Sequence, residues 1–135
     1  MSRKIIFLLV VLCLFSFVCY AQTEQAIPEE SAAVKEARYV DSLRLQVRSA
    51  NLSALSEIAA LSVKSDYAFM ALVEFAETGY EQAQSSLRGF GVSAATYEQA
   101  TKGNQVAIFK LYELAKWGNA TAKEMSDKLN PKKLD

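Results

Sequence analysis

Hydrophobic and polar positions divide the 135-residue chain into two unlike parts. Residues 5–18 are apolar apart from Ser16. From Ser31 onward alanine, leucine, glutamate, lysine and glutamine dominate, and no alternating strand pattern occurs. These residue types favour helix, and no proline interrupts them before Pro131. We therefore expect an all-α domain over residues 31–130.

Glycine and capping residues set the boundaries of the expected helices. The dipeptide Gly-Asn occurs at 103–104 and 118–119. Glycine is favoured just past a helix end and asparagine is a favoured N-cap, so each dipeptide closes one helix and opens the next. Ser65 and Ser93 are further N-cap candidates. The sequence predicts helices over residues 31–48, 52–63, 66–78, 80–88, 94–102, 104–117 and 119–129.

One short skeleton, Ala-x-x-Gly-x-x-x-Ala, recurs along the chain. Its complete copies are Ala76, Gly79 and Ala83; Ala100, Gly103 and Ala107; and Ala115, Gly118 and Ala122. Degenerate copies are Val47, Ala50 and Ala54, and Leu61, Lys64 and Ala68. Successive copies are 14, 15, 24 and 15 residues apart, so a spacing of 15 plus one of 24 makes a period of 39. Such a period is typical of stacked helical hairpins, in which the alanines let helices approach closely.

Residues 54–123 resemble Sel-one-like repeats, a branch of the tetratricopeptide family. The family's spacing of alanine, leucine and glycine occurs at 68–79 and again at 107–118. Val73 and Tyr112 depart from it, because they stand where the family has glycine. The resemblance implies a short solenoid of stacked antiparallel helical hairpins. It also implies a scaffold that binds proteins or peptides on a concave face and carries no catalysis.

The apolar opening has the form of a secretory signal peptide. Basic residues precede the apolar run, and Cys19 and Ala21 offer small residues at the −3 and −1 positions of a cut. We expect a signal peptide over 1–21, a flexible leader over 22–30 and a tail over 131–135. One alternative is an uncleaved anchor, although the run is slightly short for the ~20 residues of a spanning helix. The other is a lipid on Cys19, although the residue before it is bulky.

Composition narrows the chemistry of the exported part. Removal of residues 1–21 takes away both cysteines, and the chain has no histidine. These absences exclude Ser-His-Asp and Cys-His catalysis and the usual Cys/His zinc site. We expect no enzymatic activity, no metal and no cofactor. The remaining 13 basic and 15 acidic residues give a net charge of −2 without a basic block. We therefore expect no nucleic-acid partner and no membrane attachment after cleavage.

Aromatic residues are the candidates for contact with a protein or peptide partner. We expect Trp117, Tyr80 and Tyr112 to make such contacts. Trp117 is the only tryptophan and stands where sister copies carry polar residues, and tryptophan is enriched at interface hot spots. The alternative for Trp117 is packing on the next hairpin. The remaining aromatics at helical spacings are expected mostly in the core, with one or two lining a groove: Tyr67, Phe69, Phe75, Tyr97 and Phe109.

Two further functions stay open as alternatives. Glu74, Glu77 and Glu81 cluster around one turn, and paired carboxylates serve glycan hydrolysis; a solvated helix face is the simpler interpretation. A short array without polar end faces would instead self-associate, as a structural component of the cell envelope. The main hypothesis remains a protein-binding or peptide-binding adaptor that is exported to the bacterial periplasm or cell exterior.

Two motifs have simpler interpretations than their chemistry suggests. Residues 88–92, "RGFGV", are expected as a linker between helices, because a phosphate-binding loop needs a preceding strand. Asn51 and Asn119 match the N-glycosylation pattern. Both stand at expected helix starts, so we prefer helix capping as their role.

Overall fold

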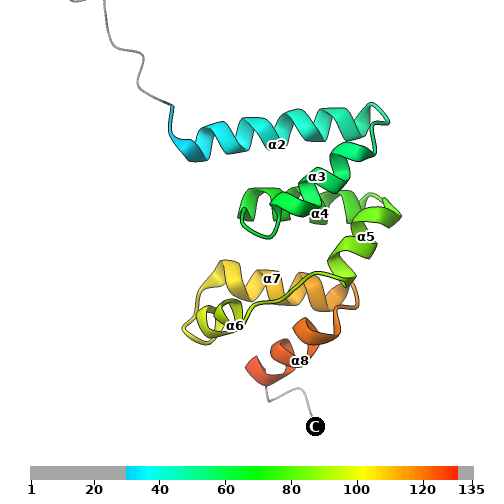
Figure 1. The fold of residues 1–135 in the computed structure, drawn as a ribbon. Coiled ribbons are helices and arrows are strands. Elements are labelled where there is room, and N and C mark those ends of the chain that lie inside the picture. The colour runs from blue at the N-terminus through cyan, green and yellow to red at the C-terminus, as the bar shows by residue number, and fades with distance from the viewer. Residues whose placement is uncertain (1–29, 131–135) are drawn as a thin grey trace, which may run out of the picture. The chain divides into compact units, whose positions relative to one another are not determined.

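A computed structural model describes residues 30–130. The predicted signal peptide, the leader up to residue 29 and the tail over 131–135 lie outside the described residues. Within them the fold is all-α, as predicted, and no strand occurs. The helices are α2 (Ala32–Arg48), α3 (Ser53–Leu61), α4 (Asp66–Glu77), α5 (Glu81–Arg88), α6 (Ala94–Thr101), α7 (Gln105–Lys116) and α8 (Ala120–Leu129) (Figure 1). Each predicted helix is present, with both ends within two residues of the expected position.

Four helices begin at a side-chain cap, as expected. The capping residues are Ser65, Ser93, Asn104 and Asn119, and each accepts a hydrogen bond from the backbone N–H three residues later. A helix start leaves its first N–H groups without partners inside the helix, and the cap satisfies one of them. The boundaries of α4, α6, α7 and α8 are therefore fixed by local chemistry.

Left-handed residues end several helices. Gly79, Gly103 and Gly118 have φ values of +97°, +85° and +88°, a conformation that glycine adopts without steric cost. Ala50 stands at the glycine position of a degenerate copy and also has a positive φ, +69°. Lys64 occupies the same position in the other degenerate copy but has no positive φ. The glycine position of the skeleton therefore coincides with a left-handed residue in four of its five copies. The exception is the copy that contains Lys64, at the turn between α3 and α4.

The helices pack in two sets of three. Within residues 33–130, α3, α4 and α5 contact one another, α6, α7 and α8 do the same, and α5 contacts α7. Figure 1 shows α3–α5 between α2 and the α6–α8 set. The start of α7 follows the start of α4 by one full period of the skeleton, and the start of α8 follows that of α5 by the same offset.

Small and large apolar residues together form the core. Every alanine of the three complete skeleton copies is buried except Ala115, which is half-buried. Leu72, Leu111 and Leu114 are also buried and belong to the same core as these alanines. Among residues 30–130, no helix combines the length and the apolarity needed to cross a bilayer.

Candidate functional site

An apolar groove lies between the first turns of α4 and α7. It has a volume of about 520 Å³. Its lining residues are Asp66, Tyr67, Phe69 and Met70 of α4, and Gln105, Val106, Phe109 and Lys110 of α7. Tyr67, Met70 and Val106 remain 38%, 47% and 48% exposed. The volume is within the range of sites that take a small ligand or a few side chains, and gathered apolar exposure marks interaction sites.

The two walls of the groove use corresponding positions of their helices. Tyr67 and Val106 are each the second residue of their helix, and Met70 and Phe109 are each the fifth. In both helices these positions carry an apolar or aromatic side chain that lines the groove. The groove therefore arises where corresponding faces of α4 and α7 lie side by side and no other element among the described residues covers them.

Phe69 and Lys110 form an unusual part of the lining. Phe69 is 1% exposed and packs edge-to-face on Phe90 at 5.5 Å between ring centroids. The Lys110 ammonium lies 5.3 Å from the centroid of the Phe69 ring and pairs with the Asp66 carboxylate at 2.5 Å. A cation held over an aromatic face gains from the ring quadrupole. Lys110 is thus fixed against the lining of the groove.

A smaller pocket extends the groove toward α6. It has a volume of about 130 Å³. Thr96, Gln99 and Asn104 line it together with Asp66, Val106, Ala107 and Lys110. Three residues, Asp66, Val106 and Lys110, line both spaces. An occupant of the apolar groove would therefore reach polar side chains at this end.

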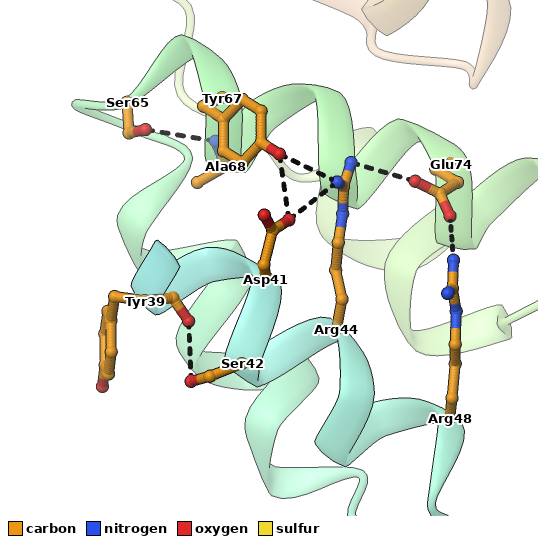
Figure 2. Close-up of polar contacts among 9 residues, drawn as sticks. All are labelled: Tyr39, Asp41, Ser42, Arg44, Arg48, Ser65, Tyr67, Ala68 and Glu74. Carbon is orange, nitrogen blue, oxygen red and sulfur yellow. Dashed lines mark hydrogen bonds and ion pairs between the residues drawn. The ribbon is translucent and has the colours of Figure 1, made fainter. Parts of the chain in front are cut away.

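Side chains of α2 hold one wall of the groove in place. Figure 2 shows Tyr67 pointing toward Asp41 and Arg44, and its hydroxyl donates to Asp41 Oδ1 (2.9 Å) and accepts from Arg44 Nη1 (3.3 Å). The hydrogen bond to Asp41 raises the pKa of Tyr67 above its usual value. Arg44 also pairs with Asp41 (3.1 Å) and Glu74 (2.9 Å), and Arg48 pairs with Glu74 (2.7 Å). The position of Tyr67 depends on this α2–α4 network.

The three aromatic residues predicted as partner contacts lie elsewhere. Tyr80 is half-buried and packs edge-to-face on Phe75, at 5.1 Å between ring centroids. Tyr112 is 40% exposed and lines a separate pocket with Asn130, whose amide donates to its hydroxyl. Trp117 is half-buried and packs against the core, with the Lys116 ammonium 5.6 Å from its ring centroid. Neither Tyr80 nor Trp117 lines that pocket or the groove.

The remaining aromatic residues lie in the core, in the groove or in both. Phe69 and Phe75 are buried and Tyr97 is half-buried against the core. Tyr67, Phe69 and Phe109 line the groove, so Phe69 belongs to both the core and the lining, and one more aromatic lines the groove than the one or two expected. Sequence reasoning missed the groove residues Met70, Val106 and Lys110. The available signal was the period of the skeleton, which relates the apolar residue at 67 to that at 106 and the one at 70 to that at 109.

Two of the three carboxylates considered for catalysis join helices to one another. Glu74 pairs with Arg44 and Arg48, which connects α4 to α2. Glu77 pairs with Lys116 at 3.0 Å, which connects α4 to α7, and its hydrogen bond raises the pKa of Lys116. Within residues 30–130 no group of three His, Cys, Asp or Glu side chains is close enough to hold a metal ion.

Asn119 connects three parts of the chain. The residue is 3% exposed, and its Oδ1 accepts the capping hydrogen bond of α8. Its amide nitrogen donates to the carbonyls of Leu87 (3.3 Å), Arg88 (3.1 Å) and Phe90 (2.8 Å). The predicted role of residues 88–92 as a helix linker is confirmed, because they join α5 to α6. Capping is confirmed for Asn119 by the bond from Ala122 N–H to its Oδ1. The nitrogen that glycosylation would modify is already engaged with the three carbonyls.

The capping role preferred for Asn51 is wrong. The N-cap of α3 is Leu52, which makes no side-chain capping bond. Asn51 instead accepts a hydrogen bond from the Ser53 hydroxyl and donates one to Gln46. The reason is the left-handed Ala50, which turns the chain so that Asn51 precedes the N-cap position.

The groove, its polar extension and the α2 network form one continuous surface. Apolar side chains gather in a hollow, and an ion pair and a hydrogen-bonded tyrosine are fixed at its edge. This surface suits recognition, since apolar area supplies affinity and the few fixed polar groups supply orientation. Comparison of the chain with protein-family models, with curated proteins and with solved structures found no match.

Proposed function

We propose that the protein is a noncatalytic helical adaptor that binds a segment of another protein or a peptide between α4 and α7. The observation that carries this proposal is the apolar groove of about 520 Å³, with Tyr67, Met70 and Val106 partly open to solvent. Apolar side chains of a partner would fill it in the manner of a helix or strand docked in a groove.

The proposal includes a repeated architecture of stacked helical hairpins similar to Sel-one-like repeats. It treats α3–α5 and α6–α8 as two copies of one three-helix unit. Three observations support it: the one-period offset of α7 from α4, the left-handed Gly79 and Gly118, and the equivalent caps Ser65 and Asn104. In this architecture the groove lies between equivalent helices of neighbouring copies.

Export to the periplasm or the cell exterior is part of the same proposal. Its support is the sequence pattern of residues 1–21, with a basic start, an apolar run and small residues before Gln22. The intact mass of the protein recovered from its host tests it. A mass that begins at Gln22 supports export with cleavage, whereas retention of residues 1–21 contradicts cleavage.

The alternatives have less support from the described residues. Self-association through end faces needs apolar ends. The α8 end presents the ion pairs Lys123–Asp127 and Glu124–Lys128 and, up to residue 130, exposes no large hydrophobic residue, so it does not suit this function, whereas α2 at the other end exposes Val34, Tyr39 and Leu45. A carboxylate-dependent hydrolase needs two free carboxyl groups close together, but of Glu74, Glu77 and Glu81 the first two are paired with cations, which leaves Glu81 alone.

Selection from a random displayed peptide library tests the binding function. The purified protein is the target, and each selected peptide is then tested against Val106→Asp and Val63→Asp. Val106 lies in the groove, whereas Val63 is 63% exposed in the turn between α3 and α4 and lines no part of it. The proposal predicts peptides that lose binding to Val106→Asp and keep it for Val63→Asp. If no selected peptide distinguishes the two variants, groove binding is wrong.

A further inference from the structure

Charged groups beside the groove are arranged unequally with respect to solvent. Lys110, in the lining, and Arg44, next to it, are 16% and 20% exposed in their side chains. Their partner carboxylates, Asp66 and Asp41, are 64% and 52% exposed. The ion pairs are therefore oriented, with the positive member held inside and the negative member facing water.

Aromatic rings of α4 produce this orientation in both cases. Lys110 lies 5.3 Å from the Phe69 ring centroid, and Arg44 lies 5.1 Å from that of Tyr67. Each cation packs against a ring that lines the groove, and the carboxylate then approaches the cation from the solvent side. Phe69 and Tyr67 thus hold the two cations inward, and the carboxylates of Asp66 and Asp41 form the solvent-facing side of these contacts.

The exposed carboxylates retain capacity for another donor. Asp66 contacts Lys110 through Oδ1, and Asp41 contacts Arg44 and Tyr67 through Oδ1. Among the described residues, Oδ2 of neither carboxylate makes a hydrogen bond or ion pair. An ionised carboxylate accepts several hydrogen bonds, so each Oδ2 is open to an ammonium or guanidinium group of an occupant.

We propose that the groove is specific for a basic amphipathic segment of a partner protein, which places apolar side chains in the groove and Lys or Arg side chains against Asp66 and Asp41. The inference rests on the proposed function and deepens it by naming the chemistry of the partner. An acidic segment would set like charges against the same edge, which is a common device for rejecting wrong partners. The contacts of the occupant with Asp66 and with Asp41 would both be exposed to solvent, so each contributes about two- to fivefold in affinity.

Three synthetic peptides test the charge preference. They have the same length and leucines at i, i+3, i+4 and i+7 of a helix, and they differ only in flanking positions, which carry lysine, glutamine or glutamate. Fluorescence anisotropy with the purified protein gives the Kd of each. We expect the lysine peptide to bind tightest and the glutamate peptide weakest, with the preference weakening as salt increases because exposed charges are screened.

Variants of the protein locate the preference. Asp66→Asn together with Asp41→Asn should bring the lysine peptide to the affinity of the glutamine peptide or below it, because the Lys110 ammonium then lacks its carboxylate; the loss is about 4- to 25-fold if the two contacts act independently. Asp66→Asn alone should cause a smaller loss of affinity. Because this variant leaves the α2–α4 network unchanged, its effect cannot come from displacement of α2. The matched control is Asp127→Asn on α8, an exposed ion-paired aspartate outside the groove, which should change nothing.

The outcomes separate this inference from the function it rests on. If the three peptides bind equally and Val106→Asp abolishes all binding, groove binding stands and the basic preference is wrong. If the glutamate peptide binds tightest, or if Asp127→Asn weakens the lysine peptide as much as Asp66→Asn, the preference is again wrong. If Val106→Asp leaves every peptide bound, the groove is not the binding site and both proposals are wrong.

Discussion

α4 and α7 have the same length and lie one skeleton period apart in the chain, but they differ in depth. Seven residues of α4 are buried, against three of α7. Ala71 and Val73 are buried in α4, whereas their counterparts Lys110 and Tyr112 are half-buried and exposed. α4 has contacts from α2 on one side and from α7 on the other. The number of neighbouring helices therefore determines how much of each helix is buried. α4, which has neighbours on two sides, carries apolar residues at positions where α7 carries Lys110 and Tyr112.

The largest expected effect comes from truncating equivalent positions of the two helices. Phe69 is 1% exposed, so Phe69→Ala should lower the free energy of unfolding by about 3–5 kcal/mol, through lost burial and the cavity left behind. Ile108 is half-buried, so Ile108→Ala should cost roughly 1–2 kcal/mol, less than a fully buried isoleucine. Urea denaturation followed by circular dichroism measures both. Equal costs would contradict the difference in depth between α4 and α7.

The asparagine caps of α7 and α8 differ in how many hydrogen bonds they make, so their removal should lower the free energy of unfolding by different amounts. Asn104 caps α7, and its side chain accepts one bond from Ala107, so Asn104→Ala should cost about 1 kcal/mol. Asn119 caps α8 and also donates to three carbonyls around the α5–α6 linker. Asn119→Ala should therefore cost about 2–3 kcal/mol, because buried carbonyls lose their donor as well.

Asn119→Asp separates the two roles of this side chain. Aspartate keeps the acceptor that caps α8 but has no amide donor for the linker carbonyls. Its unfolding free energy should fall at least as far as that of Asn119→Ala, since a carboxylate would then face those carbonyls. A cost equal to that of Asn104→Ala would show that the linker bonds contribute nothing.

Backbone conformation gives the next effect. Gly118 has φ +88°, and a Cβ added there would lie 3.8 Å from Arg88 Nε, so the space is adequate and the strain is in the backbone. Gly118→Val should cost about 1–2 kcal/mol, the penalty of a left-handed residue with a side chain. Ala50 already carries that penalty at φ +69°, so Ala50→Gly should be neutral or slightly stabilising. Thermal melts of both variants check these opposite expectations.

Local signals made the helices predictable, and the groove was not predictable for a physical reason. Ser65 and Gly118 act within one or two turns of the chain, and both took the roles that their neighbours in sequence indicate. Tyr67 and Val106 are exposed because, within residues 30–130, no third helix covers the groove between α4 and α7. The predicted capping role of Asn51 was wrong for a related reason. The left-handed Ala50 turns the chain so that Leu52, and not Asn51, takes the N-cap position of α3.

The smallest expected effect concerns pH and the α2–α4 network. Bonding to Asp41 raises the pKa of Tyr67 above its ordinary value of 10.0, so folding favours the neutral phenol. The stability from this bond is present below pH 10 and is lost as pH rises through the higher folded pKa. Tyr67→Phe should therefore melt below the wild type near pH 8, and the difference should shrink as the pH rises above 10 and through the higher folded pKa of Tyr67. A difference that does not change with pH would contradict the role of the Tyr67 hydroxyl.

Chemical-shift mapping tests the central claim, that the groove between α4 and α7 is the binding surface. The lysine-flanked peptide is titrated into isotopically labelled protein, and backbone amide shifts are followed. The account predicts the largest shifts at Tyr67, Met70, Val106 and Phe109, with little change along α8. Shifts concentrated instead around Trp117 and Tyr80, or spread over the outer face of α8, would contradict it.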